Sequence, residues 1–351
     1  MFVHFLTAFA LTAGLLLALT PLARATGLVD RPTERKQHQG EIPLIGGLAI
    51  FVTLGTLVLW FSSNDTSMYW YLGACSLLVL TGVLDDRFNI NVAVRIVIEV
   101  IAGLMMIYGA DLWVGVLGNL LGLGDIYLPQ WLSTPFTIIA VFGIINAWNM
   151  IDGMDGLAGV MTLVALGTFY FLTRSQASNN LVPVLLMGAT TAYLLFNIGS
   201  NRLLPKVFLG DAGSKLIGFS LVWLLIDGTQ SGPFTHMALP AVLALFIVGV
   251  PLIDMVVTTV RRLRKGKPPF APDRTHVHHV LLNAGFSRQE ALLLIAILAL
   301  HVNFIGIAMY LLEWGAWAQF GVFLLLTALY AMAIEHAWKL GHWLKQHHVS
   351  N

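Results

Sequence analysis

The run ALLLIAILALHVNFIGIAMYLL, residues 291–312, contains no Asp, Glu, Lys or Arg. A helix that crosses a bilayer needs roughly 20 consecutive, mainly apolar residues, so this run predicts a membrane-spanning helix. The same interpretation applies to most of the chain, because 57% of its 351 residues are hydrophobic and only 11% are charged. Soluble globular proteins carry about 25% charged residues. We therefore expect an all-α polytopic membrane protein with short loops between its helices.

Ten further apolar runs are separated by charges or by turn residues. Together they predict about eleven transmembrane helices in a single membrane-embedded domain that covers residues 1–351. The Gly-rich segment 109–133 alternates around residues 125–128, which favours a short β-hairpin. The predicted spans lie near residues 2–20, 43–62, 69–84, 92–109, 134–151, 157–173, 181–199, 213–227, 238–259, 291–312 and 317–338.

The positions of Lys and Arg predict the orientation of these spans. If the amino terminus is periplasmic, nearly all basic residues fall in or beside cytoplasmic segments, and only Arg174 falls outside. Basic loops concentrate on the cytoplasmic side of membrane proteins, so we expect a multi-pass protein of the bacterial inner membrane. Its carboxyl terminus and the long loop 260–290 would be cytoplasmic, and its hairpin periplasmic. The net charge of +1, with no basic soluble face, argues against nucleic acid as a partner.

Five aspartates lie at predicted helix ends on the cytoplasmic side. Asp85 and Asp86 end the third helix, Asp152 and Asp155 lie between the fifth and the sixth, and Asp211 precedes the eighth. Carboxylates near the hydrocarbon boundary cost free energy, so such a group is a functional hypothesis by default. No matching permanent cations accompany them, so we expect a divalent metal. The adjacent pair Asp85-Asp86 suits Mg²⁺ or the deprotonation of an attacking group, and a solvated helix end is the simpler alternative.

Two glycine-containing motifs surround the other acids. Asn149, Asp152 and Asp155 are spaced three apart, so we expect them to share one face of a helical turn. Gly153 and Gly156, which are interleaved with these residues, let a ligand approach the backbone closely. Asp211 lies in Phe208-Leu-Gly-Asp-Ala-Gly-Ser214, whose small residues suit either a helix amino terminus that binds phosphate or a simple helix cap.

The loop 260–290 combines a basic run with clustered histidines. Basic residues after a span often only determine topology, but they also suit phosphate oxygens. His276, His278 and His279 fit two roles, zinc ligation or hydrogen-bond donation to a pyrophosphate, and no cysteine accompanies them. In the first internal loop, Lys36 suits closure over a nucleotide or an ordinary basic linker. The basic residues of the long loop include Arg261, Arg262, Arg264, Lys265, Lys267 and Arg274.

Four of these motifs resemble those of the polyprenyl-phosphate N-acetylhexosamine-1-phosphate transferases, in the same order along the chain. The similarity covers about residues 30 to 340. The segment Pro268-Pro-Phe-Ala-Pro-Asp-Arg-Thr-His and the basic run before it are most similar to the branch that uses N-acetylglucosamine. The motifs are Asp85-Asp86-x-x-Asn89, Asn149-x-x-Asp152-Gly-x-Asp155-Gly-Leu-Ala, Phe208-Leu-Gly-Asp211-Ala-Gly-Ser and His276-Val-His278-His279.

This resemblance implies a reaction and a set of roles. UDP-N-acetylglucosamine and undecaprenyl phosphate would give the lipid-linked sugar pyrophosphate and UMP, with Mg²⁺ or Mn²⁺, at the cytoplasmic face. The product would initiate cell-surface polysaccharide synthesis of the O-antigen or enterobacterial common antigen type. We expect Asp211, Asp85 and Asp86 as metal ligands; Asp85, Asp86, Asp152, Asp155, His276, His278 and His279 as catalytic residues; and Lys36, Asn149, Asn197, Arg262, Arg264 and Arg274 as substrate-binding residues.

Three other interpretations stay open. A sister transferase would use another UDP-N-acetylhexosamine or a UDP-muramoyl peptide, because loop geometry reads the sugar. An ion-coupled transporter would use Asp254, Glu99 and Arg95, but it would place acids near the bilayer midplane. Arg95 and Glu99 are four residues apart, which favours a buried structural pair. A noncatalytic scaffold would not need acids, histidines and glycines on one face. A homodimer is compatible with either enzyme.

Overall fold

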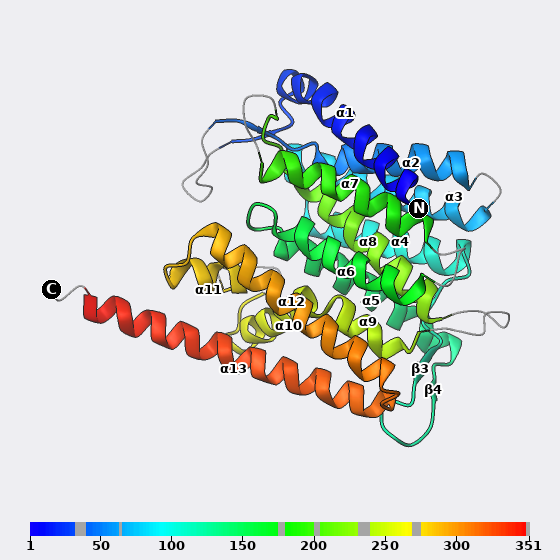
Figure 1. The fold of residues 1–351 in the computed structure, drawn as a ribbon, viewed down its shortest axis with the longest axis vertical. Coiled ribbons are helices and arrows are strands. Elements are labelled where there is room, and N and C mark those ends of the chain that lie inside the picture. The colour runs from blue at the N-terminus through cyan, green and yellow to red at the C-terminus, as the bar shows by residue number, and fades with distance from the viewer. Residues whose placement is uncertain are drawn as a thin grey trace. The chain divides into compact units, whose positions relative to one another are not determined.

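The structure of the protein is a computed structural model, and its described residues are almost entirely helical (Figure 1). Two pairs of short strands are the other regular elements in these parts of the chain. The prediction of an all-α fold is therefore confirmed. The described residues are 1–31, 40–62, 65–174, 180–199, 204–230, 239–268 and 275–348, the last twelve of them as backbone only.

Each of the eleven apolar runs coincides with a helix or with two helices joined at a break. Side-chain caps begin several of them: Asp65 accepts from the Ser67 amide, which satisfies a donor that the helix leaves unpaired. The elements are α1 (Phe2–Thr26), β1 (Val29–Asp30), β2 (Ile42–Pro43), α2 (Gly46–Phe61), α3 (Thr66–Phe88), α4 (Val92–Leu104), the π-helix η1 (Met105–Gly109), β3 (Val116–Gly118), β4 (Ile126–Tyr127), α5 (Gln130–Ile151), α6 (Leu157–Thr173), α7 (Leu181–Asn197), α8 (Gly210–Thr229), α9 (Ala241–Ile247), α10 (Gly249–Arg264), α11 (Val277–Asn283), α12 (Arg288–Leu311) and α13 (Ala316–His348).

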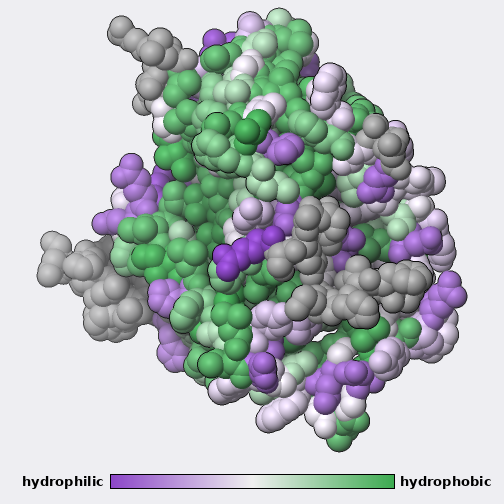
Figure 2. Space-filling model, turned by 45° about the vertical axis from the view of Figure 1, so that its right-hand side comes forward, coloured by the Kyte–Doolittle hydropathy of each residue, from purple (hydrophilic) through white to green (hydrophobic). Residues whose placement is uncertain are grey.

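Helix length and composition identify a membrane protein. Within the described ranges, six helices are long and apolar enough to cross a membrane, and the pair α9–α10, bent by 82°, would make a seventh. Hydrophobic side chains cover much of the face shown in Figure 2. Three shorter apolar helices, α2, α6 and α7, fall below the length of a full crossing. The count of eleven spans and their orientation therefore stay predictions.

The chain forms two compact units, and the prediction of one domain is not decided by this division. The first unit comprises residues 1–116 and 127–239, and the second comprises residues 117–126 and 240–351. Helix α8 is the core of the first unit, because every residue from Ala212 to Ile226 is buried. It packs against α2, α3, α5 and α6. A helix that is buried on all sides needs no polar face.

Glycines allow α2 and α3 to approach the start of α8 closely. A Cβ atom added to Gly47 would collide with the backbone of Gly213, and one added to Gly82 would collide with the backbone of Ala212. Small residues at helix contacts let backbones come together in this way. The contacts fix the first turn of α8, which carries Asp211.

We expect Gly82→Ala to destabilise the protein by about 1–3 kcal/mol, the usual cost of overpacking. The matched control is Gly55→Ala in α2, because nothing lies within 4 Å of the Cβ position there and Ala favours a helix over Gly. Thermal unfolding of both purified variants in detergent measures the difference. Equal unfolding temperatures would contradict the close contact between α3 and α8.

The second unit is built from α9 to α13. The short helix α11 packs against α12 and α13, and α10 also contacts α12 and α13. A capping box at Ser287 and Glu290 fixes the start of α12. Strands β3 and β4 pair as the short hairpin predicted around residues 125–128. That prediction is confirmed as structure, and the placement of the hairpin in the periplasm stays a prediction.

Candidate active site

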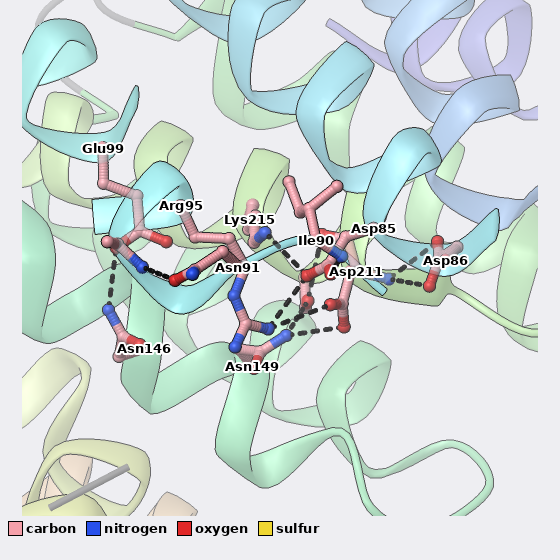
Figure 3. A network of polar contacts seen from close by, with 12 residues as sticks. Asp85, Asp86, Ile90, Asn91, Arg95, Glu99, Asn146, Asn149, Asp211 and Lys215 are labelled. Atoms are coloured by element: carbon pink, nitrogen blue, oxygen red, sulfur yellow. Dashed lines mark hydrogen bonds and ion pairs between the residues drawn. The ribbon is translucent and has the colours of Figure 1, made fainter. Parts of the chain in front are cut away.

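Three helices of the first unit bring polar side chains together: the last turn of α3, the start of α4 and the first turns of α8 (Figure 3). Asp85 and Asp211 both point toward Arg95, whose Nη1 lies 2.9 Å from Asp85 Oδ2 and 3.9 Å from Asp211 Oδ2. Lys215 Nζ lies 3.5 Å from the same Asp85 oxygen, and both side chains are 3% exposed. The two cations offset the cost of burying Asp85.

The expectation that the acids would lack permanent cations is therefore wrong for Asp85. It is wrong for Asp155 as well, because Lys206 Nζ lies 2.6 Å from its Oδ2. Lys215 had a signal in the sequence, since it follows Asp211 by four residues and so shares its helix face. No sequence pattern indicated the partner of Arg95, because Asp85 is ten residues away on another helix.

The expected pairing of Arg95 with Glu99 is also corrected by the structure. Glu99 is buried and its Oε2 accepts a hydrogen bond from Asn146 Nδ2 at 2.9 Å. Arg95 instead reaches the carboxylates of α3 and α8. The reason is that the Asn146 amide from α5 holds the Glu99 carboxylate, while two carboxylates at the ends of α3 and α8 lie within reach of the guanidinium.

The Asp86 carboxylate binds the amino terminus of α8. Both of its carboxylate oxygens accept from the backbone N–H of Asp211, each at 3.0 Å. Gly210 adopts φ +73°, a conformation that favours glycine and lets the chain turn into the helix there. The Asp211 amide is therefore occupied by a carboxylate from α3, and the N-cap residue Leu209 makes no side-chain cap. Both interpretations of this motif, a phosphate site and a cap formed by its own residues, stay predictions.

Asn149 orients Asp211 from α5. Its Nδ2 donates to Asp211 Oδ1 at 2.9 Å and to Ser214 Oγ at 3.0 Å. The expectation that Asn149, Asp152 and Asp155 share one helical turn is wrong, because α5 ends at Ile151 and the next two acids lie in the C-cap and the following turn. Gly156, which follows Asp155, adopts a left-handed conformation (φ 77°) and begins α6.

Asn197 ties the loop after α5 to the segment before α8. Its Oδ1 accepts from the Gly156 amide at 2.6 Å, and its Nδ2 donates to the Val207 carbonyl at 2.9 Å. The side chain is only 2% exposed. This geometry is that of a positioning residue, and contact between Asn197 and a nucleotide stays a prediction.

The cluster carries an excess of negative charge. Burial raises the pKa of the Asp152 carboxyl well above its usual range, and the charges of Asp211, Asp86 and Asp155 raise it further. A cation at this place would relieve that repulsion. Within the described ranges, no group of three or more His, Cys, Asp or Glu side chains is arranged to hold a metal ion. Mg²⁺ commonly takes one or two carboxylates together with substrate phosphates, so the oxygen donors present fit a cation shared with a substrate.

The predicted histidine segment lies in the second unit, where a separate buried network holds it. Asp254 Oδ2 lies 2.7 Å from His276 Nδ1, and Asp254 Oδ1 accepts from the Val277 amide at 3.0 Å and from the Tyr330 hydroxyl at 2.7 Å. Arg262 Nη2 lies 3.1 Å from His276 Nε2. A guanidinium can only donate, so Nε2 is the acceptor and His276 is neutral with its proton on Nδ1. Both ring nitrogens are therefore engaged within the protein.

The other two histidines differ from His276 and from one another. His278 is 1% exposed, and within the described residues neither of its ring nitrogens has a hydrogen-bond partner. Burial lowers the pKa of His278 to about 3, with contributions from His279 and His276, so this ring is neutral near pH 7. His279 is partly exposed. A zinc site built from all three rings would have to break the bonds of His276.

The remaining predicted residues are less constrained by the structure. Arg262 is buried at 4% exposure and belongs to the network just described. Arg264 is exposed at the end of α10. Lys36 and Arg274 lie outside the described residues. The roles predicted for all of these side chains are untested by the geometry alone.

Comparison with known proteins identifies the class and then the family of this membrane-embedded protein. Residues 67–229 match the model of glycosyl transferase family 4, so the class is a transferase. The chain is 37% identical over 341 residues to an undecaprenyl-phosphate alpha-N-acetylglucosaminyl 1-phosphate transferase of Yersinia pestis, covering 96% of this chain and 92% of that protein. The enzyme of the same name from Haemophilus influenzae is 40% identical over 354 residues, 98% of this chain and 96% of that protein. The chain therefore belongs to glycosyl transferase family 4, as its motifs indicated.

Proposed function

We propose that this chain transfers N-acetylglucosamine 1-phosphate from UDP-N-acetylglucosamine to undecaprenyl phosphate. The observation that carries the proposal is the convergence of Asp85, Asp86 and Asp211 with Arg95 and Lys215 at the ends of apolar helices. It occurs in a chain that is 37–40% identical over nearly its full length to relatives named for that activity. The lipid acceptor explains why such a site belongs to a membrane protein.

The reaction requires stabilisation of negative charge more than it requires proton transfer. An oxygen of the lipid phosphate attacks the phosphorus that bears the sugar, and the bridging P–O bond to UMP breaks. UMP leaves as a stable anion, and a phosphate oxygen is already nucleophilic at neutral pH, so direct attack needs no covalent enzyme intermediate. The obstacle is repulsion between two anionic substrates. Fixed positive groups that face the developing charge lower that barrier.

The polar residues of the first unit have separate proposed roles. Asn149 and the amide anchored by Asp86 fix the position of Asp211. Arg95 and Lys215 keep Asp85 ionised beside it. Asp211 is 31% exposed, so it is the residue that we propose as the principal ligand of Mg²⁺ or Mn²⁺, with Asp85 next to it. When bound, the cation would neutralise phosphate charge and assist departure of UMP.

In the second unit, we propose that His279 contacts the pyrophosphate and that His276 holds His279 in position. His276 is engaged on both nitrogens, whereas His279 is partly exposed. A neutral histidine still donates one N–H to a phosphate oxygen. Lys36 and Arg274 are proposed to supply further donors to the nucleotide phosphates, on the basis of their charge and position in the sequence.

We further propose the inner membrane as the location, with eleven spans, a periplasmic amino terminus and a cytoplasmic site. The nearly one-sided distribution of Lys and Arg supports this orientation. Cysteine labelling from either side of the membrane tests it. Labelling of position 267 from the periplasm would reverse the assignment.

A radiolabel assay with purified enzyme and undecaprenyl phosphate tests the function directly. With UDP-N-acetylglucosamine, we expect a lipid-linked product and one UMP for each product molecule. A sister activity would instead give product only with another UDP-N-acetylhexosamine or a UDP-muramoyl peptide. Release of UMP without lipid product, or no turnover with any donor in Mg²⁺ or Mn²⁺, would contradict the proposal.

A further inference from the structure

A groove of about 770 Å³ opens between α10 and α13 of the second unit. Its wall is mainly apolar and includes Val256 and Val260 on α10 and Leu324 and Ile334 on α13. Val256 and Val260 are each 40% exposed and Leu324 is 51% exposed. Both helices belong to segments that are apolar enough to cross a membrane. We therefore expect this apolar wall to face the hydrocarbon core of the membrane.

The same groove is lined by cations. Arg261, Arg264 and Lys265, at the end of α10, stand against one acid, Glu335, which gives a formal charge of +2. The Thr275 hydroxyl also lines the groove, and it is buried without a hydrogen-bond partner among the described residues. The groove thus combines an apolar wall with several cations and with a hydroxyl that has no partner among the described residues. These features are complementary to a molecule with a hydrocarbon chain and an anionic headgroup.

The length of the groove distinguishes among lipids. Its lining on α13 includes Leu324 and Ile334, ten residues apart, or about 15 Å of helix. The hydrocarbon core of a bilayer is about 30 Å thick, so one leaflet accounts for about 15 Å. The groove therefore matches an acyl chain of one leaflet better than a long polyprenyl chain.

We propose that this groove binds an anionic phospholipid of the surrounding bilayer. An acyl chain lies along Val260 and Leu324, and the phosphate accepts hydrogen bonds from Arg264, Lys265 and the Thr275 hydroxyl. Basic pockets between membrane helices recognise anionic headgroups in this way. Arg264 then faces a lipid phosphate in place of the nucleotide expected from the sequence. This proposal does not rest on the proposed transferase activity.

Native mass spectrometry of the purified full chain in detergent tests the site with defined lipids. We expect one phosphatidylglycerol to bind per chain, and phosphatidylethanolamine, which has no net charge, to bind much more weakly. The double variant Arg264→Gln/Lys265→Gln should weaken phosphatidylglycerol binding about tenfold or more, because each basic residue near a headgroup contributes to the attraction. Val260→Trp should weaken binding of both lipids by filling the groove.

Two matched controls keep this test specific. Arg31→Gln/Arg288→Gln removes the same charge at exposed positions outside the groove lining. Leu300→Trp adds the same ring on α12, where the side chain is 53% exposed and outside the groove lining. Both controls should bind phosphatidylglycerol as the unmodified chain does, and thermal unfolding verifies that each variant is folded.

Three results would overturn the proposal. Equal binding of the two phospholipids would remove the role of the cations. Equal losses in the groove variants and their controls would place the lipid elsewhere. Displacement of phosphatidylglycerol by an equimolar amount of undecaprenyl phosphate would show that the groove is an acceptor site instead.

Discussion

Asp211→Asn is expected to lower turnover by at least about a hundredfold, the effect seen when one preorganised electrostatic group is removed from a site. The substitution keeps the shape of the side chain and the backbone N–H that Asp86 holds. The Asn149 amide can still donate to the remaining oxygen. What disappears is one negative charge at the proposed cation site, so the loss should fall on turnover and not on folding.

Radiolabelled product formation across a Mg²⁺ titration measures this effect. The matched control is Asp125→Asn, an exposed acid of the segment between β3 and β4, which should leave turnover unchanged. Near-normal activity of the Asp211 variant in saturating Mg²⁺ would mean that only metal affinity was reduced. Undiminished activity at low Mg²⁺ would remove Asp211 from the metal site. Equal unfolding temperatures would show that the helices still pack.

The sequence was sufficient to predict where the helices and the acids lie along the chain. Apolar runs mark helices because each run is long, and each predicted run coincides with a helix or a bent pair of helices. Asp85, Asp86 and Asp211 meet because all three lie at neighbouring helix ends. The pattern of charges predicts these helix ends, whereas the contact between α3 and α8 that brings the three acids together depends on tertiary packing.

The partners of these acids could not be predicted, because they depend on the packing of α8. Gly47 and Gly82 let two helices approach its first turn, and only this approach places Asp85 beside Lys215. A sequence records neither the distance between helices nor which of two neighbours a flexible Arg95 selects. The contact between the Asp86 carboxylate and the Asp211 amide likewise joins two helices that are far apart in the sequence.

The histidine segment shows the same limit in the second unit. Spacing left zinc ligation and phosphate binding equally open, and Asp254 was considered only as a residue of a transporter. The structure shows that Asp254 lies 22 residues from His276 in sequence and 2.7 Å from it in space. No local pattern predicts such a contact, because the loop between them determines the return path of the chain.

Asp254→Asn is expected to be among the most destabilising single substitutions in the second unit. The Asp254 carboxylate accepts hydrogen bonds from His276, Val277 and Tyr330 and is 2% exposed. An amide cannot replace it in either orientation. If its oxygen faces His276, its NH₂ group faces the Val277 amide, and two donors meet. If its oxygen faces Val277, the NH₂ group forces the His276 proton onto Nε2, where it meets Arg262.

The substitution also takes the charged acceptor away from the hydrogen bonds of His276, Val277 and Tyr330. Each hydrogen bond to a charged group contributes about 1.5–3 kcal/mol, and three bonds are affected, so we expect a loss of more than about 3 kcal/mol. Tyr330→Phe is the matched control, because it removes only one hydrogen bond to the same carboxylate and should cost about 1.5–3 kcal/mol, the range for a bond to a charged group.

Thermal unfolding and transferase assays on the same preparations separate structure from positioning. Asp254→Asn combined with Arg262→Met should recover part of the stability, because the guanidinium that opposes a proton on His276 Nε2 is then absent. Activity should stay low in that double variant, since His276 no longer has a fixed tautomer and the start of α11 has lost its carboxylate anchor. Equal unfolding temperatures for Asp254→Asn and Tyr330→Phe would refute the stabilising role of the buried Asp254 carboxylate, and full activity in the double variant would refute the positioning role of His276.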